Sequence, residues 1–489
     1  MTATTATTFL TRAHVTAQIA NTPKVSPQIA WSDAGLPKIA QHLFSLMLRN
    51  LASDGFSFVD PNHPDPTDPQ SLSLPGCIIA APSSPVNTPG IDQDYVYNWT
   101  RDAAITAIEI AAAKMPTTPE SGVQPLVDYV NFAQICQNNA TPSLALASYT
   151  IRGGSRQWTE QTDGPALQTL AILMAYDQLD TPTQGVAKDV INKNLNYLLG
   201  AYQEQTFNLW EEHQGFSFFA RSVQLRCLQS IRANAIGIPV PAGTDAAIAW
   251  LQTALQQHWN GALYMSLIPA PPGYDANIDI VSACVYGAVS CTDTKLLATA
   301  AQVRDQWENP NSPDHYPINV TDENNQGIGP LLGRYPGDVY DGDVNDPSAG
   351  DHPWALCTCN LAELYYSLAN HIQNTQAVPL DQFSTNFFSQ IGVTPLTPVA
   401  DVVSQLQDAG DAMLAAVIYH SDHLELSEQF DGVTGYEKSV KNLTWSYAAF
   451  LSAVRARTGQ NVQGEALSRS AIRPSIRAVR GRRIVSPRA

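Results

Sequence analysis

Positive charge and long apolar runs are both scarce in this chain. Its 489 residues include 27 Lys or Arg against 44 Asp or Glu, which gives a formal net charge of -17. This balance argues against a general nucleic-acid-binding protein, because phosphate backbones require a basic face. No stretch approaches the ~20 consecutive apolar residues that cross a bilayer, so we expect no membrane contact. The composition is instead compatible with a soluble globular protein and an uncharged ligand.

Cysteine is also sparse, with 7 residues in the whole chain. Cys357 and Cys359 are too close for a zinc-knuckle spacing and no pair of histidines accompanies them, so we assign no metal site and expect no cofactor. We interpret the cysteines as buried small apolar residues. A disulfide between Cys284 and Cys291 is left open.

The two ends of the chain differ from the middle. Residues 1–32 are rich in Thr and Ala, and no acidic residue precedes Asp33. They lack the charged start and apolar stretch of a secretory signal, so we expect a poorly ordered extension and favour a cytoplasmic location. Residues 461–489 form a basic tail. We expect residues 33–460 to form one domain.

The middle of the chain is patterned for helices. Apolar residues recur at helical spacing in residues 35–51, 101–114, 121–138, 165–179, 186–204, 216–234, 244–257, 293–306, 353–371, 399–419 and 442–457, and more weakly in 378–391. Residues 101–114 and 442–457 are apolar nearly all round, which indicates full burial, whereas 186–199 has a polar face. Alternating inner and outer helices, about twelve in all, predict an all-α barrel of helical hairpins.

Segments that mix aromatic and polar residues recur just before the predicted helix starts. They are DYVYNWTRD (94–102), EQTDGPALQ (160–168), NLWEEHQG (208–215), GYDAN (273–277), GRYPGDVY with DHPWALC (333–340 and 351–357), and LSEQFDG with NLTWSYAA (426–432 and 442–449). Aromatic faces stack on sugar rings while carboxylates, amides and guanidinium groups bond hydroxyls. If these loops converge at one end of a barrel, they form a carbohydrate pocket.

Two glutamates in these segments suit glycoside hydrolysis, which needs one carboxylic acid and one carboxylate. Glu211 follows Trp210 and precedes Glu212; an aromatic wall and a second carboxyl both favour the protonated form that a general acid requires. The alternative is that the Glu-Glu pair is a solvated helix start. Glu428, beside Phe430, is the candidate for the second carboxylate, and its alternative is a loop residue without a catalytic task.

Taken together and in this order, these motifs resemble the glucoamylases, an inverting family of glycoside hydrolases, over roughly residues 35 to 458. The resemblance implies that residues 33–460 are a catalytic domain, an (α/α)6 barrel with its site where the inner helices begin. It implies that Glu211 is the general acid, that Glu428 is the general base, and that the enzyme releases β-D-glucose from non-reducing ends of α-1,4-linked glucans. It also implies that substrate is bound by Tyr95, Trp99, Arg101, Asp102, Trp210, Glu212, Arg334, Trp354 and Trp445.

The sequence departs from the family pattern at several positions. Trp158 stands one place nearer to Asp163 than the platform tryptophan of many members, so its role in substrate binding is open. Asn208 replaces a common Asp, Gly337 replaces a common Glu, and we expect no starch-binding domain after about residue 460. Two alternatives therefore remain: an α-glucosidase for α-1,6 or trehalose linkages, and a non-catalytic sugar-binding or regulatory protein on the same barrel. We expect a monomer.

Overall fold

The computed structural model describes residues 35–82, 95–118, 120–233, 236–340 and 351–459. The predicted N-terminal extension (1–32) and basic tail (461–489) lie outside the described residues. Their boundaries stay predictions, as does the extent of the single domain at 33–460.

A ring of inner helices forms the centre of the described structure. Each inner helix packs against the next, and the last packs against the first to close the ring. In chain order these helices are α3 (Thr100–Ala112), α5 (Asp163–Ala175), α7 (Phe218–Ala233), α9 (Asp279–Val285), α12 (Ala355–Thr375) and α15 (Thr444–Arg457). Nearly every residue of α3 and α15 is buried, as their apolar character on all sides predicts.

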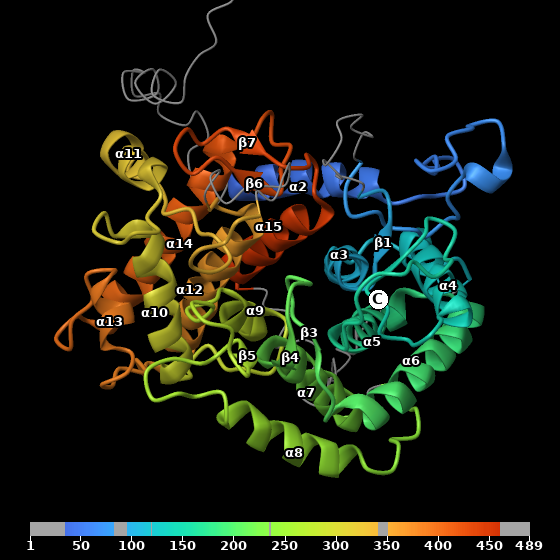
Figure 1. Cartoon of the computed structure of the whole chain (residues 1–489), viewed down its shortest axis with the longest axis horizontal. Coiled ribbons are helices and arrows are strands. Elements are labelled where there is room, and N and C mark those ends of the chain that lie inside the picture. The colour runs from blue at the N-terminus through green and yellow to red at the C-terminus, as the bar shows by residue number, and fades with distance from the viewer. Residues whose placement is uncertain (1–34, 83–94, 119, 234–235, 341–350, 460–489) are drawn as a thin grey trace, which may run out of the picture.

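A second set of helices covers the ring from outside (Figure 1). The outer helices are α2 (Leu36–Met47), α4 (Gln124–Asn139), α6 (Thr181–Ala201), α8 (Thr244–Gln256), α10 (Thr294–Glu308) and α14 (Val399–His420). Capping residues set some of their starts: the carboxylates of Asp180 and Asp293 accept hydrogen bonds from backbone N–H groups at the starts of α6 and α10. Each outer helix packs on an inner one, so the predicted (α/α)6 barrel is confirmed.

Two described helices were not expected from the sequence. The inner helix α9 has only 7 residues, too few to show a helical period, although the motif before it was recognised. The helix α11 (Pro317–Gln326) is mostly polar and lies outside the ring. The weak candidate at 378–391 contains the short α13 (Thr385–Ser389), which lies outside the ring, and α9 completes the inner ring instead.

Short strands and single turns complete the described elements. All strand pairs are antiparallel: β1 (Asn98–Trp99) with β2 (Ser148–Tyr149), β3 (Thr206–Phe207) with β4 (Gln214–Ser217), β4 with β5 (Leu267–Ile268), and β6 (Gln429–Phe430) with β7 (Glu437–Lys438). The 3-10 turns are η1 (Leu48–Asn50), η2 (Pro69–Ser71) and η3 (Tyr176–Gln178). β1, β4 and β6 lie ahead of α3, α7 and α15, where they fix the loops that carry the sequence motifs.

The cysteines form no disulfide. All seven are described and free, and only Cys291 is not fully buried, so the bridge left open between Cys284 and Cys291 does not form. Within the described ranges no cluster of His, Cys, Asp and Glu could hold a metal ion. None of the helices that the structure describes has the length and apolar character to span a bilayer.

Candidate active site

A cavity of about 380 Å³ opens where the inner helices begin, within the usual size of a small-molecule site. The loops before α3, α7, α12 and α15 all contribute to its wall. Every site residue predicted from the sequence lines it: Tyr95, Trp99, Arg101, Asp102, Trp158, Trp210, Glu211, Glu212, Arg334, Trp354, Glu428 and Trp445. The rest of its lining is Ala80, Arg156, Leu209, Tyr340, Leu356 and Leu443. Four of the six motif groups predicted to converge therefore meet at this cavity, whereas 160–168 and 273–277 supply none of its lining residues.

Arg101 and Asp102, in the first turn of α3, lie at the deep end of the cavity and are each only 6% exposed. Arg101 donates from Nη1 to Gln161 at 2.9 Å and to Asp163 at 3.3 Å, and its guanidinium lies over the Trp445 ring. Burial raises the pKa of Asp102 to about 6, against the lowering effect of Arg101. Asp102 Oδ2 is buried and accepts no hydrogen bond from a described residue, although Arg101 Nε lies 3.8 Å from it; a hydroxyl of a bound ligand would supply a donor.

Glu211 lies in the turn between β3 and β4. Because α7 begins only at Phe218, Glu211 is not part of a helix start. Its carboxylate accepts hydrogen bonds from Trp99 Nε1 at 3.0 Å, from Arg101 Nη2 at 3.3 Å and from Trp158 Nε1. Its φ of 66° lies in the left-handed region, which costs a residue with a side chain about 1–2 kcal/mol. Surrounding contacts must therefore hold this backbone in place.

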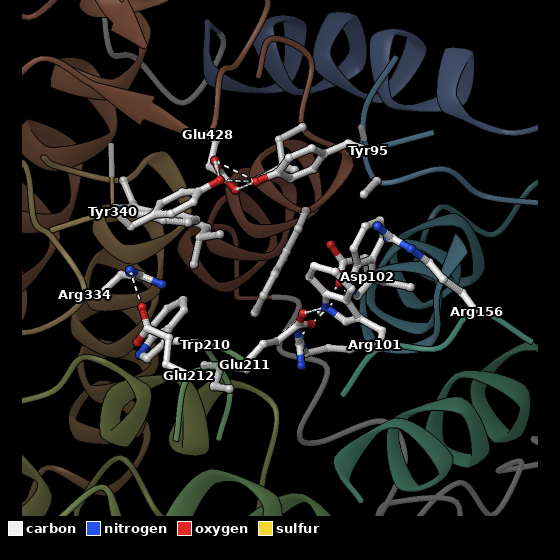
Figure 2. A pocket seen from close by; sticks show the side chains of 18 residues that line it. Tyr95, Arg101, Asp102, Arg156, Trp210, Glu211, Glu212, Arg334, Tyr340 and Glu428 are labelled. Carbon is white, nitrogen blue, oxygen red and sulfur yellow. Dashed lines mark hydrogen bonds and ion pairs between the residues drawn. The ribbon is translucent and has the colours of Figure 1, made fainter. Parts of the chain in front are cut away.

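Glu212 turns away from Glu211 toward the next loop (Figure 2). It accepts hydrogen bonds from Arg334 Nη2 and from the Tyr335 hydroxyl, each at 2.8 Å. Arg334 is bound on its other side by both carboxylate oxygens of the fully buried Asp338, each at 2.6 Å. Glu212, itself exposed, is therefore bound to the buried Arg334, and it does not face Glu211 as the adjacent positions in the sequence suggested.

Glu428, immediately before β6, faces Glu211 from the opposite side of the cavity (Figure 2). It is 4% exposed and accepts hydrogen bonds from the hydroxyls of Tyr95 at 3.1 Å, Tyr340 at 3.3 Å, and Ser439. Burial raises the pKa of Glu428 to about 7, and these hydroxyl donors and Arg334 oppose that shift. All of these donors favour the carboxylate form that could accept a proton from water.

Trp210 and Trp445 are held by specific hydrogen bonds, whereas the buried Nε1 of Trp354 has no hydrogen-bond partner among the described residues. Trp210 Nε1 donates to Asn277 Oδ1 at 3.0 Å, and its ring centre lies 5.8 Å from that of Trp354. Trp445 Nε1 donates to the hydroxyl of Tyr286 at 3.2 Å. Asn277 belongs to the motif at 273–277, which does not line the cavity; it supports Trp210 from behind.

Three residues at the site were missed by the sequence reasoning. Tyr340 lies within the quoted motif GRYPGDVY, and its aromatic hydroxyl could have marked it. Arg156 lies over the rings of Tyr97, at 3.9 Å, and Trp158, at 4.4 Å, within the segment that departs from the family pattern. No sequence signal identifies Ser439, because its approach to Glu428 depends on the pairing of β6 with β7.

The fold and the site together define a class of enzyme. Opposed carboxyl groups in an aromatic cavity, with buried polar groups at one end, match what hydrolysis of a glycosidic bond requires. No metal cluster is formed by the residues that the structure describes. This arrangement is that of a glycoside hydrolase on a helical barrel.

Comparison with known proteins gives the family. The model of "Glycosyl hydrolases family 15" matches residues 70–455, and the chain belongs to this family. It is 28% identical to a probable glucoamylase of Schizosaccharomyces pombe, over 84% of this chain and 88% of that protein. It is 27% identical to an intracellular sporulation-specific glucoamylase of Saccharomyces cerevisiae, over 78% and 79%.

Solved structures agree on the fold. The glucoamylase of Hormoconis resinae superposes with a TM-score of 0.72 at 24% identity, over 88% of this chain and 75% of that one. The glucoamylase of Saccharomycopsis fibuligera gives a TM-score of 0.68 at 22% identity, over 88% and 96%. The resemblance noted from the motifs is confirmed.

Proposed function

We propose that this protein is an exo-acting hydrolase that releases β-D-glucose from the non-reducing ends of α-1,4-linked glucans with inversion of configuration. Membership of the family and relatives named glucoamylases support this activity. The single observation that carries it is that Glu211 and Glu428, far apart in the chain, reach into one cavity from opposite sides (Figure 2).

The non-reducing glucose enters first and is bound at the deep end. Arg101 donates to adjacent hydroxyls, and Asp102 Oδ2, which accepts no hydrogen bond from a described residue, accepts from them. Tyr95 stacks beneath this ring, with Trp99 and Trp445 along the wall. Because Arg101 and Asp102 are 6% exposed whereas Trp158 is 50% exposed, the cavity has a closed end and an open end. A closed end that holds the terminal hydroxyls permits attack only from a chain end.

The leaving sugar lies toward the open side of the cavity. Glu212 and Arg334, fixed by their mutual bond at 2.8 Å, offer an acceptor and a donor to its hydroxyls. Trp210 and Trp354 supply apolar surface beside them. Trp158 extends this wall toward solvent, where further glucose units of the chain continue.

Glu211 acts as the general acid and protonates the glycosidic oxygen as the bond to the anomeric carbon lengthens. Glu428 acts as the general base and takes a proton from a water on the opposite ring face; the water oxygen attacks the anomeric carbon and β-glucose is released. Inverting enzymes place the two carboxyl groups roughly 6.5–9.5 Å apart to leave room for this water. The hydroxyls of Tyr95, Tyr340 and Ser439 orient the carboxylate of Glu428 during this step.

The decisive experiment follows the anomer released from maltoheptaose by NMR. We expect β-glucose to appear first and to mutarotate later, and Glu211→Gln and Glu428→Gln to lose most turnover while remaining folded. Initial release of α-glucose would indicate a retaining reaction, and no release would favour a sugar-binding protein. Rates on maltose, isomaltose, dextran and trehalose, measured together, determine the preferred linkage.

Variants also separate the two carboxyl roles. α-D-Glucosyl fluoride has a leaving group that departs without protonation, so loss of a general acid affects it little. Glu211→Gln should hydrolyse this substrate while Glu428→Gln should not. The reverse pattern would exchange the roles of the two residues.

A further inference from the structure

Asn208 is a fully buried residue that closes the turn carrying Glu211 and Glu212. Its Oδ1 accepts hydrogen bonds from the backbone N–H groups of Glu212 at 2.9 Å and His213 at 3.1 Å. Its Nδ2 donates to the hydroxyl of Tyr274. The Asn208 backbone N–H donates to His213 O at 2.8 Å, and its carbonyl accepts from Glu211 N–H at 3.1 Å. One side chain and its own peptide groups thus span the whole turn.

This closure explains how Glu211 keeps an unfavourable backbone conformation. A φ of 66° is uncommon for a residue with a side chain, and it persists only where neighbouring contacts determine it. Asn208 accepts hydrogen bonds from the backbone N–H of Glu211 itself and from those of the two residues that follow it. Without them the peptide can relax to a more favourable φ, which would move the carboxyl away from Trp99 and Trp158.

Asn208 also connects this turn to Arg101, the residue proposed to bind the hydroxyls of the terminal glucose. Gln161 donates from Nε2 to the Asn208 carbonyl at 2.6 Å, and its Oε1 accepts from Arg101 Nη1 at 2.9 Å. All three residues are buried. This amide bridge therefore links the place of the bound glucose to the turn of Glu211, in addition to the direct hydrogen bond from Arg101 Nη2 to Glu211 at 3.3 Å.

We propose that Asn208 is a positioning residue for general acid catalysis, which sets where the Glu211 carboxyl meets the glycosidic oxygen. The inference rests on the assignment of Glu211 as the general acid. The neutral side-chain amide of Asn208 accepts hydrogen bonds from the backbone of the turn and donates one to Tyr274. Asn208 therefore fixes the turn without placing a second negative charge behind Glu211.

The test compares two substrates that lack a second sugar and therefore do not involve Glu212. Phenyl α-D-glucoside needs protonation of its leaving oxygen, whereas α-D-glucosyl fluoride does not. We expect Asn208→Ala to lower kcat on the phenyl glucoside by about 100-fold, the scale for a displaced catalytic group, and to change the fluoride rate little. An equal loss on both substrates, or no loss on either, would overturn the proposal.

An isosteric variant covers the case in which Asn208→Ala fails to fold. Asn208→Asp keeps the acceptor for both backbone N–H groups, and the Tyr274 hydroxyl can donate to its second oxygen. Because the turn stays closed in this variant, the ratio of its phenyl glucoside rate to its fluoride rate should stay close to the wild-type ratio. A fall of about 100-fold in this ratio despite the retained acceptor contradicts the proposal.

Further variants serve as controls. Tyr274→Phe removes only the hydroxyl that Asn208 Nδ2 contacts, and it should reduce the phenyl glucoside rate less than Asn208→Ala does. Glu211→Gln separates the two proposals: wild-type activity on phenyl glucoside in this variant would refute the general acid itself. If Glu211→Gln is inactive on phenyl glucoside but still hydrolyses the fluoride, and Asn208→Ala slows both substrates equally, only the role of Asn208 is refuted.

Discussion

The indole Nε1 of Trp158 donates a hydrogen bond to Glu211 Oε2, across 53 positions of sequence. Trp158 belongs to the segment that departs from the family pattern, and its spacing left its role open. The structure shows that the shifted tryptophan still reaches this carboxyl group. Arg156, with its guanidinium 4.4 Å from the centre of the indole ring, holds that ring from the other side.

Removing this donor should weaken catalysis more than substrate binding. Trp158→Phe keeps an aromatic wall but loses the N–H, and a hydrogen bond to the carboxylate that forms as Glu211 gives up its proton contributes about 1.5–3 kcal/mol. We expect kcat on maltoheptaose to fall about 10- to 100-fold, with a smaller change in KM. Gln157→Ala, an exposed neighbour, is the control and should leave both constants unchanged. A rise in KM without a fall in kcat would show that Trp158 only binds sugar.

The hydroxyl of Ser439 should set part of the pH dependence. Its hydrogen bond lowers the pKa of Glu428, which burial raises to about 7. A general base works only when ionised, so activity is lost as pH falls through this pKa. Ser439→Ala should therefore move the acid limb of the kcat/KM profile to higher pH. Ser421→Ala, a half-buried serine that donates to a backbone carbonyl, is the control. An acid limb at the wild-type position would show that Ser439 does not act on Glu428.

The buried carboxylate of Glu428 should destabilise the folded state at high pH. The pKa of Glu428 in the folded chain is about 7, above its ordinary value of 4.5, so the native state binds its proton more tightly than the unfolded state does. Stability is then lost as pH rises from 4.5 through 7. Glu428→Gln should raise the free energy of unfolding by up to about 3 kcal/mol at about pH 8 and change it little at about pH 4. Urea denaturation at both pH values measures this; an equal effect at the two would contradict the titration argument.

Arg334 should be required for folding as well as for substrate binding. It is 3% exposed and separates the carboxylates of Glu212 and Asp338. Arg334→Met leaves both without their cation, and breaking a buried ion pair costs about 3–5 kcal/mol. Arg232→Met, which removes an exposed ion pair with Asp245, should cost much less and serves as the control. Similar losses in the two variants, measured by chemical denaturation, would contradict this.

Much of the barrel could be predicted from the sequence alone. Helices apolar on all sides, such as α3 and α15, must be buried, and the acidic and aromatic residues before them were recognisable because both signals are local. For the same reason the amino-acid sequence was enough to single out Glu211 and Glu428. The recurrence of these motifs ahead of the inner helices also predicted that they meet at one end of the barrel.

Other features required the tertiary structure, because they depend on contacts between distant segments. The short α9 becomes an inner helix only through its packing between α7 and α12, since 7 residues carry no helical period of their own. Adjacent positions suggested that Glu212 faces Glu211, but the turn that Asn208 closes directs it to Arg334. Ser439 reaches Glu428 through strand pairing that leaves no mark on the residue itself. Local periodicity therefore determined most of the helices, and long-range hydrogen bonds determined how the side chains of the candidate site are held.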